Sequence, residues 1–201
     1  MARPRGALDP ERTRQALLTA ATAQFARYGY AGTTLRAVAD AAGIGAPSLL
    51  YHFDSKEALF NAVLTEVWTG VRGRIIEMLP AATTPEEVLG IAYGEMLDTE
   101  AANGTLLAQI SGALLGGPGV GKEAIDSTLL PLLNDIAAAI TACEVDPVRP
   151  DAPVLAALIY VMFAHSARLL LADRAEREVA SVREHEVTFA SAVLGSLRAG
   201  Q

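Results

Sequence analysis

The sequence predicts an all-α fold of about nine helices, with no sheet. The chain has 201 residues, of which 51% are hydrophobic and only 5% aromatic. Its abundant alanine and leucine favour helices over strands. Apolar residues recur at helical spacing along most of the chain, and no useful stretch alternates as a strand would. We expect two domains, a helix-turn-helix domain over residues 1–54 and a helical domain over residues 55–201.

The first helix is predicted to follow a short basic arm, residues 1–8, in which proline and glycine oppose helix formation. Asp9 can cap the helix, Pro10 suits its first position, and Glu11 suits the positive end of the helix dipole. Helical spacing then continues through Leu17, Ala21, Phe25 and Tyr28. Gly29 is predicted to end this helix.

Two short helices follow. Thr33 or Thr34 caps the first of them, Gly43 ends it, and the second runs from Ala46 to about His52. Two helices of about eight residues joined by a tight glycine turn are typical of the helix-turn-helix motif. Because helices this short are marginal alone, we expect them to pack on the first and fourth helices.

The rest of the chain also predicts helices. Asp54 or Ser55 caps a fourth helix that ends at Pro80, and Thr84 with Glu87 forms a capping box for a fifth that reaches about Asp98. Further helices are predicted over residues 105–115, 151–172 and 177–197. Another helix is predicted to contain Pro131, and this proline should disturb it.

Charge is distributed unevenly along the chain. The net charge is −7, but residues 1–56 carry seven Lys or Arg against four Asp or Glu, a local charge of +3. The remainder therefore carries −10. A basic end on an acidic body fits a protein that meets a phosphate backbone with one end only.

Residues 116–123 match the pattern of a nucleotide-binding P-loop, but three features argue against that function. Glu123 stands where a Ser or Thr should bind magnesium, the preceding segment is predicted to be a helix, and no strand ending in Asp follows. A flexible connection between helices is the better interpretation. We therefore expect no enzyme activity and no catalytic residues.

The sequence offers little other chemistry. The three histidines, His52, His165 and His185, lack metal-ligand spacing, so we expect no metal and no cofactor. A single cysteine, Cys143, excludes an intrachain disulfide and favours a cytoplasmic location. The longest apolar stretch, residues 154–171, is too polar for a membrane span, and we expect neither a signal peptide nor a membrane partner.

Four segments carry a family resemblance. Residues 33–39 (TTLRAVA), 42–44 (AGI), 48–53 (SLLYHF) and 55–59 (SKEAL) resemble the DNA-binding domain of the tetracycline repressor (TetR) family. The match runs from about residue 13 to residue 64, roughly a quarter to a third of the chain. The resemblance implies a ligand-responsive transcription regulator, most simply a repressor, that binds a palindromic operator as a homodimer.

The resemblance assigns DNA contacts to matching positions. Thr34 aligns with a phosphate-contacting residue, Arg36 lies beside it, and Lys56 is expected to meet the DNA backbone. Arg3 and Arg5 resemble basic arms that enter the minor groove. The recognition helix carries the remaining candidates, Ala46, Pro47, Ser48, Tyr51 and His52. Each also has an ordinary structural interpretation: packing for Tyr51, a solvated surface for His52 and Arg36, and a nonspecific basic tail for the arm.

The residue types agree with this assignment on chemical grounds. Phosphate contacts need hydroxyls, basic side chains and helix N-termini. Base reading from the third helix is limited to Ser48 and His52, with Ala46 and Pro47 as apolar contacts to thymine methyl groups. Two departures from the family pattern, Ala46-Pro47 and Leu50 in place of a common tyrosine, affect the identity of the DNA site. Indirect readout and dimer spacing are therefore expected to contribute.

The C-terminal domain is expected to bind a small, mainly apolar effector and to form the dimer. Its candidate effector-binding residues, which could instead be ordinary core, are Trp68, Tyr93, Met96, Gln109, Met162, Phe163 and His165. The candidate dimer interface comprises Leu155, Leu158, Ile159, Met162, Ala190, Val193 and Leu194. Two rival functions stay open, a helical interaction protein that has lost DNA binding and the disfavoured P-loop enzyme.

Overall fold

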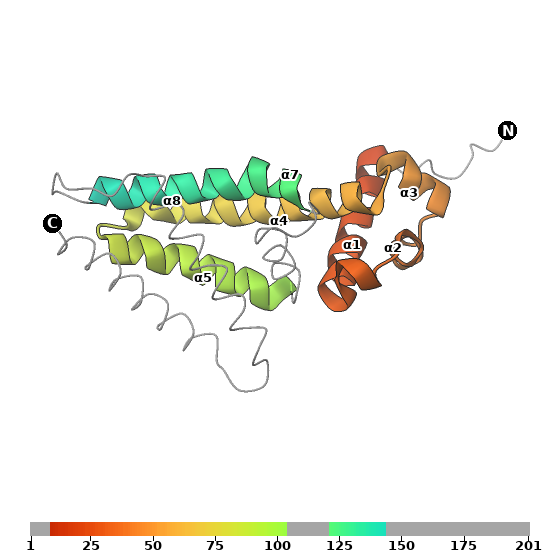
Figure 1. Ribbon diagram of the computed structural model, residues 1–201, viewed down its shortest axis with the longest axis horizontal. Coiled ribbons are helices and arrows are strands. Elements are labelled where there is room, and N and C mark those ends of the chain that lie inside the picture. Colours follow the sequence, from red (N-terminus) through yellow and green to blue (C-terminus); the bar gives the residue numbers. More distant parts are fainter. Residues whose placement is uncertain (1–8, 104–120, 144–201) are drawn as a thin grey trace, which may run out of the picture.

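The computed structural model describes residues 9–103 and 121–143, and these are arranged as helices with no β-strand among them (Figure 1). This confirms the predicted all-α class. The predicted basic arm, the glycine-rich segment 116–120 and the helices over 105–115, 151–172 and 177–197 lie outside the described residues.

Helix α1 (Pro10–Gly32) begins as predicted, since the Asp9 carboxylate accepts a hydrogen bond from the Glu11 amide at 3.2 Å. Its end differs from the prediction. Gly29 has φ of +75°, which kinks the helix, but helical turns continue to Gly32. The kink requires glycine because a side chain disfavours this left-handed φ. The chain then leaves the helix at Thr33, whose amide donates to the Gly29 carbonyl.

Helices α2 (Leu35–Ala42) and α3 (Ala46–His52) form the predicted helix-turn-helix. The cap of α2 is Thr34, whose hydroxyl accepts from the Ala37 amide at 3.1 Å. Thr33 is instead buried, and its hydroxyl contacts the Gly29 carbonyl at 2.8 Å. Gly43 ends α2 in the left-handed conformation, with φ of +66°.

Helix α4 (Lys56–Met78) begins at Ser55, whose hydroxyl accepts from the Ala58 amide at 3.0 Å. It ends in a short 3-10 turn, η1 (Leu79–Ala81), which contains the predicted terminator Pro80. Figure 1 shows α4 running from the N-terminal helices into the bundle formed with α5 and α8. One helix therefore connects the two parts of the molecule.

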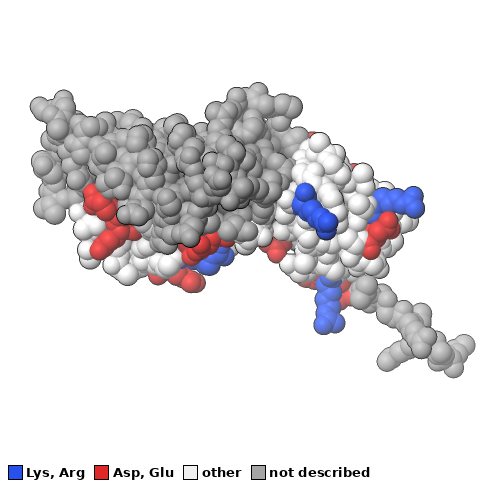
Figure 2. All heavy atoms as spheres, turned by 90° about the horizontal axis from the view of Figure 1, so that it is seen from below, with Lys and Arg blue, Asp and Glu red and all other residues white. Residues whose placement is uncertain are grey.

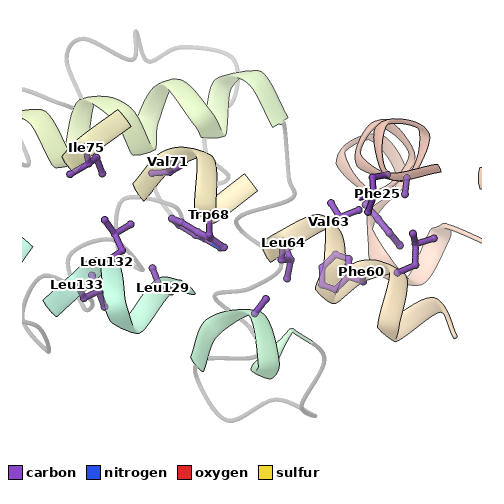
Figure 3. Close-up of a cluster of buried hydrophobic side chains, with 14 of the residues drawn as sticks. Phe25, Phe60, Val63, Leu64, Trp68, Val71, Ile75, Leu129, Leu132 and Leu133 are labelled. Carbon is purple, nitrogen blue, oxygen red and sulfur yellow. The ribbon is translucent and has the colours of Figure 1, made fainter. Parts of the chain in front are cut away.

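The buried face of α4 packs against a different partner at each end (Figure 3). Near its start, Phe60 makes an edge-on contact with Phe25 of α1, with ring centroids 4.9 Å apart. Farther along, Trp68, Val71 and Ile75 belong to the apolar cluster shared with α5 and α8. A displacement of α4 would therefore change packing contacts in both regions.

Helix α5 (Pro85–Asn103) has the predicted capping box and runs beyond its expected end near Asp98. The Thr84 hydroxyl accepts from the Glu87 amide at 3.2 Å, and the Glu87 carboxylate accepts from the Thr84 amide at 3.3 Å. The same carboxylate accepts from the Thr83 amide and hydroxyl, and these bonds lower the pKa of Glu87.

The last described helices are a short turn, α7 (Lys122–Ala124), a π-helical segment, η2 (Ile125–Leu129), and α8 (Leu130–Cys143). The expected disturbance near Pro131 is thus confirmed as η2. Pro131 cannot donate a backbone hydrogen bond, and its ring crowds the preceding turn. Two ion pairs join the bundle helices, Arg72–Asp135 at 2.6 Å and Arg74–Glu95 at 2.5 Å.

Candidate nucleic-acid interface

The candidate interface is built on the head, by which we mean residues 9–55; the body is residues 56–103 and 121–143. Helix α3 is short and two-sided. Leu49 and the following Phe53 are buried, whereas Leu50 is 51% exposed and Tyr51 is 81% exposed. Packing of α2 and α3 against α1 holds this exposed face outward.

The predicted contacts on α3 lie together on its outer surface. Ala46, Pro47 and Ser48 are exposed in its first turn, and no side chain caps this turn. At its other end, the rings of Tyr51 and His52 meet edge to face with centroids 5.3 Å apart. These five predicted residues thus form one end of the head, and their DNA contacts stay predictions.

Two predicted phosphate contacts lie on α2. Thr34 is exposed while capping the helix, so its hydroxyl already accepts one hydrogen bond. Arg36 pairs with Asp40 at 3.8 Å, but the two side chains are 88% and 73% exposed. A surface ion pair of this length holds its arginine weakly, so Arg36 can exchange Asp40 for a phosphate.

Lys56 is turned toward α1. Its ammonium donates to the carbonyls of Tyr30 at 2.9 Å and Thr33 at 3.2 Å. It also lies 4.4 Å from the centre of the Tyr30 ring, a cation–π contact. Burial, with a smaller contribution from Glu57, raises the pKa of Tyr30. Lys56 therefore joins the start of α4 to the α1–α2 corner, and these bonds compete with its predicted phosphate contact.

Sequence reasoning did not identify two features of the head. Leu50 was noted only as a departure from the family pattern, although Leu49 and Leu50 cannot both face the core of a seven-residue helix. The Arg14 guanidinium lies 5.6 Å from the centre of the Phe53 ring, which fixes the end of α3 against α1. The two adjacent leucines could have indicated that one of them is exposed. No pattern of neighbouring residues in the sequence connects Arg14 with Phe53.

The described surface shows an acidic body, whereas basic and acidic groups balance on the head. In Figure 2 the head displays both Lys or Arg and Asp or Glu side chains, while the visible described part of the body displays mainly Asp and Glu. Arg3 and Arg5 lie outside the described residues. Residues 9–55 carry four Arg against four Asp or Glu, so the charge of +3 over residues 1–56 comes from Arg3, Arg5 and Lys56.

Three predicted effector-binding residues fall in the described body. Trp68 and Tyr93 are buried at 3% and 0% exposure, and Met96 packs against the same cluster. Among the described residues, no acceptor lies within hydrogen-bonding distance of the Trp68 indole nitrogen, Nε1. The other predicted effector and dimer residues lie outside the described part, namely Gln109, Leu155, Leu158, Ile159, Met162, Phe163, His165, Ala190, Val193 and Leu194.

Two open grooves in the described region involve none of these residues. One, of about 640 Å³, lies between α1 and α4 and includes Arg14, Asn61 and Glu66. The other, of about 480 Å³, lies between α4 and α5 and includes Arg74 and Glu95. In the described part of the chain, no helix is long and apolar enough to cross a membrane, and no cluster of His, Cys, Asp and Glu side chains could hold a metal ion.

Known proteins resemble the head in sequence. Residues 17–63 match the family model of bacterial regulatory proteins of the tetR family. The repressor KstR2 of Mycolicibacterium smegmatis is 41% identical over 81 residues, which cover 40% of each chain. The regulator RutR of Escherichia coli strain K12 is 44% identical over 54 residues, 27% of this chain and 26% of RutR. The similarity thus spans less than half of these relatives.

Solved structures resemble nearly the whole chain in fold. A tetR-family transcriptional regulator from Streptomyces coelicolor aligns with a TM-score of 0.73 and 22% identity, covering 96% of this chain and 85% of that protein. FadR from Bacillus subtilis, solved in complex with stearoyl-CoA, aligns with a TM-score of 0.72 and 17% identity over 87% and 95% of the two chains. Residues 17–63 therefore form a domain of the tetR-family type, and the chain shares the fold of these solved regulators.

Proposed function

We propose that this protein is a homodimeric transcriptional repressor that binds a palindromic operator and is released from it by a small, mainly apolar effector. Helices α2 and α3 dock on the DNA, and the body carries the effector and dimer sites. The observation that carries the proposal is the outer face of α3, with Ser48, Tyr51 and His52, on a helix that packs against α2, which carries the exposed Arg36 and is capped by the exposed Thr34.

The exposed residues of the head fit the chemistry of a phosphate backbone. A hydroxyl at the start of α2, an exposed guanidinium and the phenol of Tyr51 are all donors used for phosphate contact. The acidic body disfavours contact with DNA, so the head is the end that docks. These contacts position the protein, whereas the first turn of α3 provides the groups that face base edges.

The geometry by which such motifs read DNA supports a homodimer. One helix-turn-helix covers one half-site, and a two-fold dimer presents two recognition helices about 34 Å apart, one turn of DNA. Two-fold symmetry in the protein predicts a palindrome in the operator. We assign the dimer face to residues 151–172 and 177–197, whose apolar pattern requires a cover.

Helix α4 is the element that would transmit effector binding. Its first turns pack on Phe25 of α1, and its later turns form the core with α5 and α8. An effector that wedges this core tilts α4 and changes the spacing of the two heads. Release requires that the effector bind the DNA-incompetent state more tightly than the competent one. The Trp68 indole N–H, which has no acceptor within the described part of the chain, supports a ligand that offers a hydrogen-bond acceptor within an apolar body.

The first experiment is selection of bound duplexes from a random pool by the full-length protein at moderate salt. We expect a palindrome whose half-site centres lie about one helical turn apart. A folded, dimeric protein that enriches no sequence would contradict the proposal and favour the rival function, a helical interaction protein without DNA binding.

Tyr51→Ala tests the docking face on the selected operator. We expect weaker binding to all duplexes and a shallower dependence of affinity on salt, because a backbone contact carries no sequence information. Tyr28→Ala is the matched control, since Tyr28 is also an exposed tyrosine, at 50%, but lies on α1. Equal affinity of wild type and Tyr51→Ala would remove α3 from the docking face.

Trp68 provides a test of the effector site because it is the chain's single tryptophan. Stearoyl-CoA, which has a long apolar acyl chain and is bound in the FadR structure, is the first probe. Choline, a small cation bound by a structurally similar regulator from Saccharomonospora viridis, is the contrasting probe. We expect an apolar probe to change Trp68 fluorescence and to lower operator affinity over the same concentration range. Release of the operator without any change at Trp68 would place the effector elsewhere.

A further inference from the structure

The recognition helix lacks the side chains that usually identify purines. Between Ala46 and His52 there is no Arg, Lys, Asn, Gln, Asp or Glu. Arg or Lys reads guanine and Asn or Gln reads adenine through two hydrogen bonds, and acidic groups read cytosine. Only Ser48, Tyr51 and His52 bring polar groups, and the latter two lie at the end of the helix.

The same helix exposes apolar groups on one side. Leu50 is 51% exposed, whereas its neighbour Leu49 is completely buried and fills the core position. Leu50 follows the exposed Pro47 by three residues and the exposed Ala46 by four, so the three share one face of the helix. A single exposed leucine needs no explanation. Three exposed apolar side chains on one face of the helix that is expected to enter the major groove do need an explanation.

Thymine is the base that offers an apolar group in the major groove. Its 5-methyl group distinguishes T·A from A·T and from both G·C orientations, and apolar side chains recognise it by contact. Burial of a methyl group against a leucine removes apolar surface of both from water. The exposed face of α3 thus matches thymine better than any other base.

We propose that Leu50 is a specificity-determining residue that contacts the 5-methyl group of a thymine in each operator half-site. The proposal rests on the proposed DNA-binding function, and it specifies how that function selects its sequence. The half-site is read through methyl groups by Leu50, Pro47 and Ala46, with Ser48 as the polar contact nearest to them in sequence.

The test replaces each thymine of the selected half-site, one at a time, by uracil, which differs only in lacking the methyl group. Wild-type protein should lose about threefold to tenfold in affinity at one thymine, the loss expected for one buried methyl group. Leu50→Ala should bind the unmodified operator more weakly by a similar factor and should be indifferent to uracil at that thymine. The coupling between the two changes identifies the contact.

Leu130→Ala is the matched control, because Leu130 is an exposed leucine, at 44%, at the start of α8 in the body. It should retain both the operator affinity and the uracil sensitivity of the wild type. Circular dichroism of Leu50→Ala should equal that of the wild type, since the exposed side chain carries little of the core.

Two results would overturn the inference while leaving the proposed function intact. The wild type would bind the uracil-substituted operators as tightly as the native one, or Leu50→Ala would keep the full uracil sensitivity. Failure of the wild type to select any duplex would instead reject the DNA-binding function, and this inference with it. If the second of these results came with a change in self-association of Leu50→Ala, the apolar face would be assigned to a protein contact.

Discussion

The head and the body of this protein are specified by different kinds of interaction. In the head, the short helix α2 begins at a capping threonine, and α1 meets the start of α4 through large aromatic contacts, such as Phe25 on Phe60. In the body, the longer helices share a mainly aliphatic core that is continuous with the core of the head. Sequence similarity to the family model is confined to residues 17–63, whereas fold similarity at 17% identity covers 87% of the chain.

This difference teaches how the two regions tolerate change. A core of aliphatic side chains accepts many substitutions that keep volume and pattern, so the body can diverge and retain its fold. The head combines a compact three-helix core with an outer surface that, under the proposed function, must also fit DNA, so fewer residue types satisfy it at each position. The following predictions test this contrast, beginning with the largest expected effect.

The aromatic contact between head and body should be the most sensitive site. Phe60→Ala removes a ring that is 1% exposed and touches both Phe25 and Tyr30, at 4.9 and 5.0 Å between centroids. We expect a loss of about 3–5 kcal/mol in the free energy of unfolding, measured by urea denaturation. Ile76→Ala, at an exposed position of the same helix, should change little. Equal losses in the two variants would show that the head does not depend on this contact.

Lys56→Met tests whether Lys56 stabilises the head or serves DNA alone. The variant keeps much of the side-chain length and removes the ammonium that binds the carbonyls of Tyr30 and Thr33. We expect a loss of about 1.5–3 kcal/mol in stability in the absence of DNA, the range for hydrogen bonds to charged groups. Unchanged thermal stability together with weakened operator binding would assign Lys56 to the phosphate backbone instead.

Equivalent caps in the two regions allow a direct comparison. Thr34→Ala and Thr84→Ala each remove a hydroxyl that accepts a helix amide, and each should lower stability by about 1 kcal/mol. Hydrogen exchange should separate them. Loss of the Thr34 hydroxyl should speed amide exchange over most of the eight-residue α2. Loss of the Thr84 hydroxyl should speed exchange only in the first turn of the longer α5. Identical exchange patterns would contradict the expectation that the helices of the head depend more on their caps than those of the body.

The smallest effect concerns the pH dependence of the body. Hydrogen bonds from Thr83 and Thr84 lower the pKa of Glu87 in the folded protein, so its carboxylate contributes stability above its ordinary pKa. That contribution should disappear as pH falls through the lowered value. Glu87→Gln should therefore be less stable than wild type near neutral pH, and the difference should shrink in acid. Glu77→Gln, at an exposed glutamate of α4, is the control. If the stability difference between Glu87→Gln and wild type did not vary with pH, it would not come from the charge of the Glu87 carboxylate.

Helix starts were predictable from sequence because capping is local. Asp9, Thr84 and Glu87 bind amides two to three residues away, so the residues that decide the helix start are visible in the sequence itself. The sequence did not decide which of two adjacent capping candidates is used. Thr34 rather than Thr33 caps α2, and Ser55 rather than Asp54 caps α4, because burial and backbone direction select one of two competent side chains.

The all-α class, the helix-turn-helix and the basic residues near the N-terminus were predictable from residue order, because helical periodicity, caps and charge are properties of adjacent residues. Three features result instead from tertiary packing: Leu50 faces outward, Lys56 turns toward the α1–α2 corner, and Arg14 lies against Phe53. These three outcomes depend on where distant helices pack. Local residue patterns carry no information on that packing, because many arrangements satisfy the same periodicity.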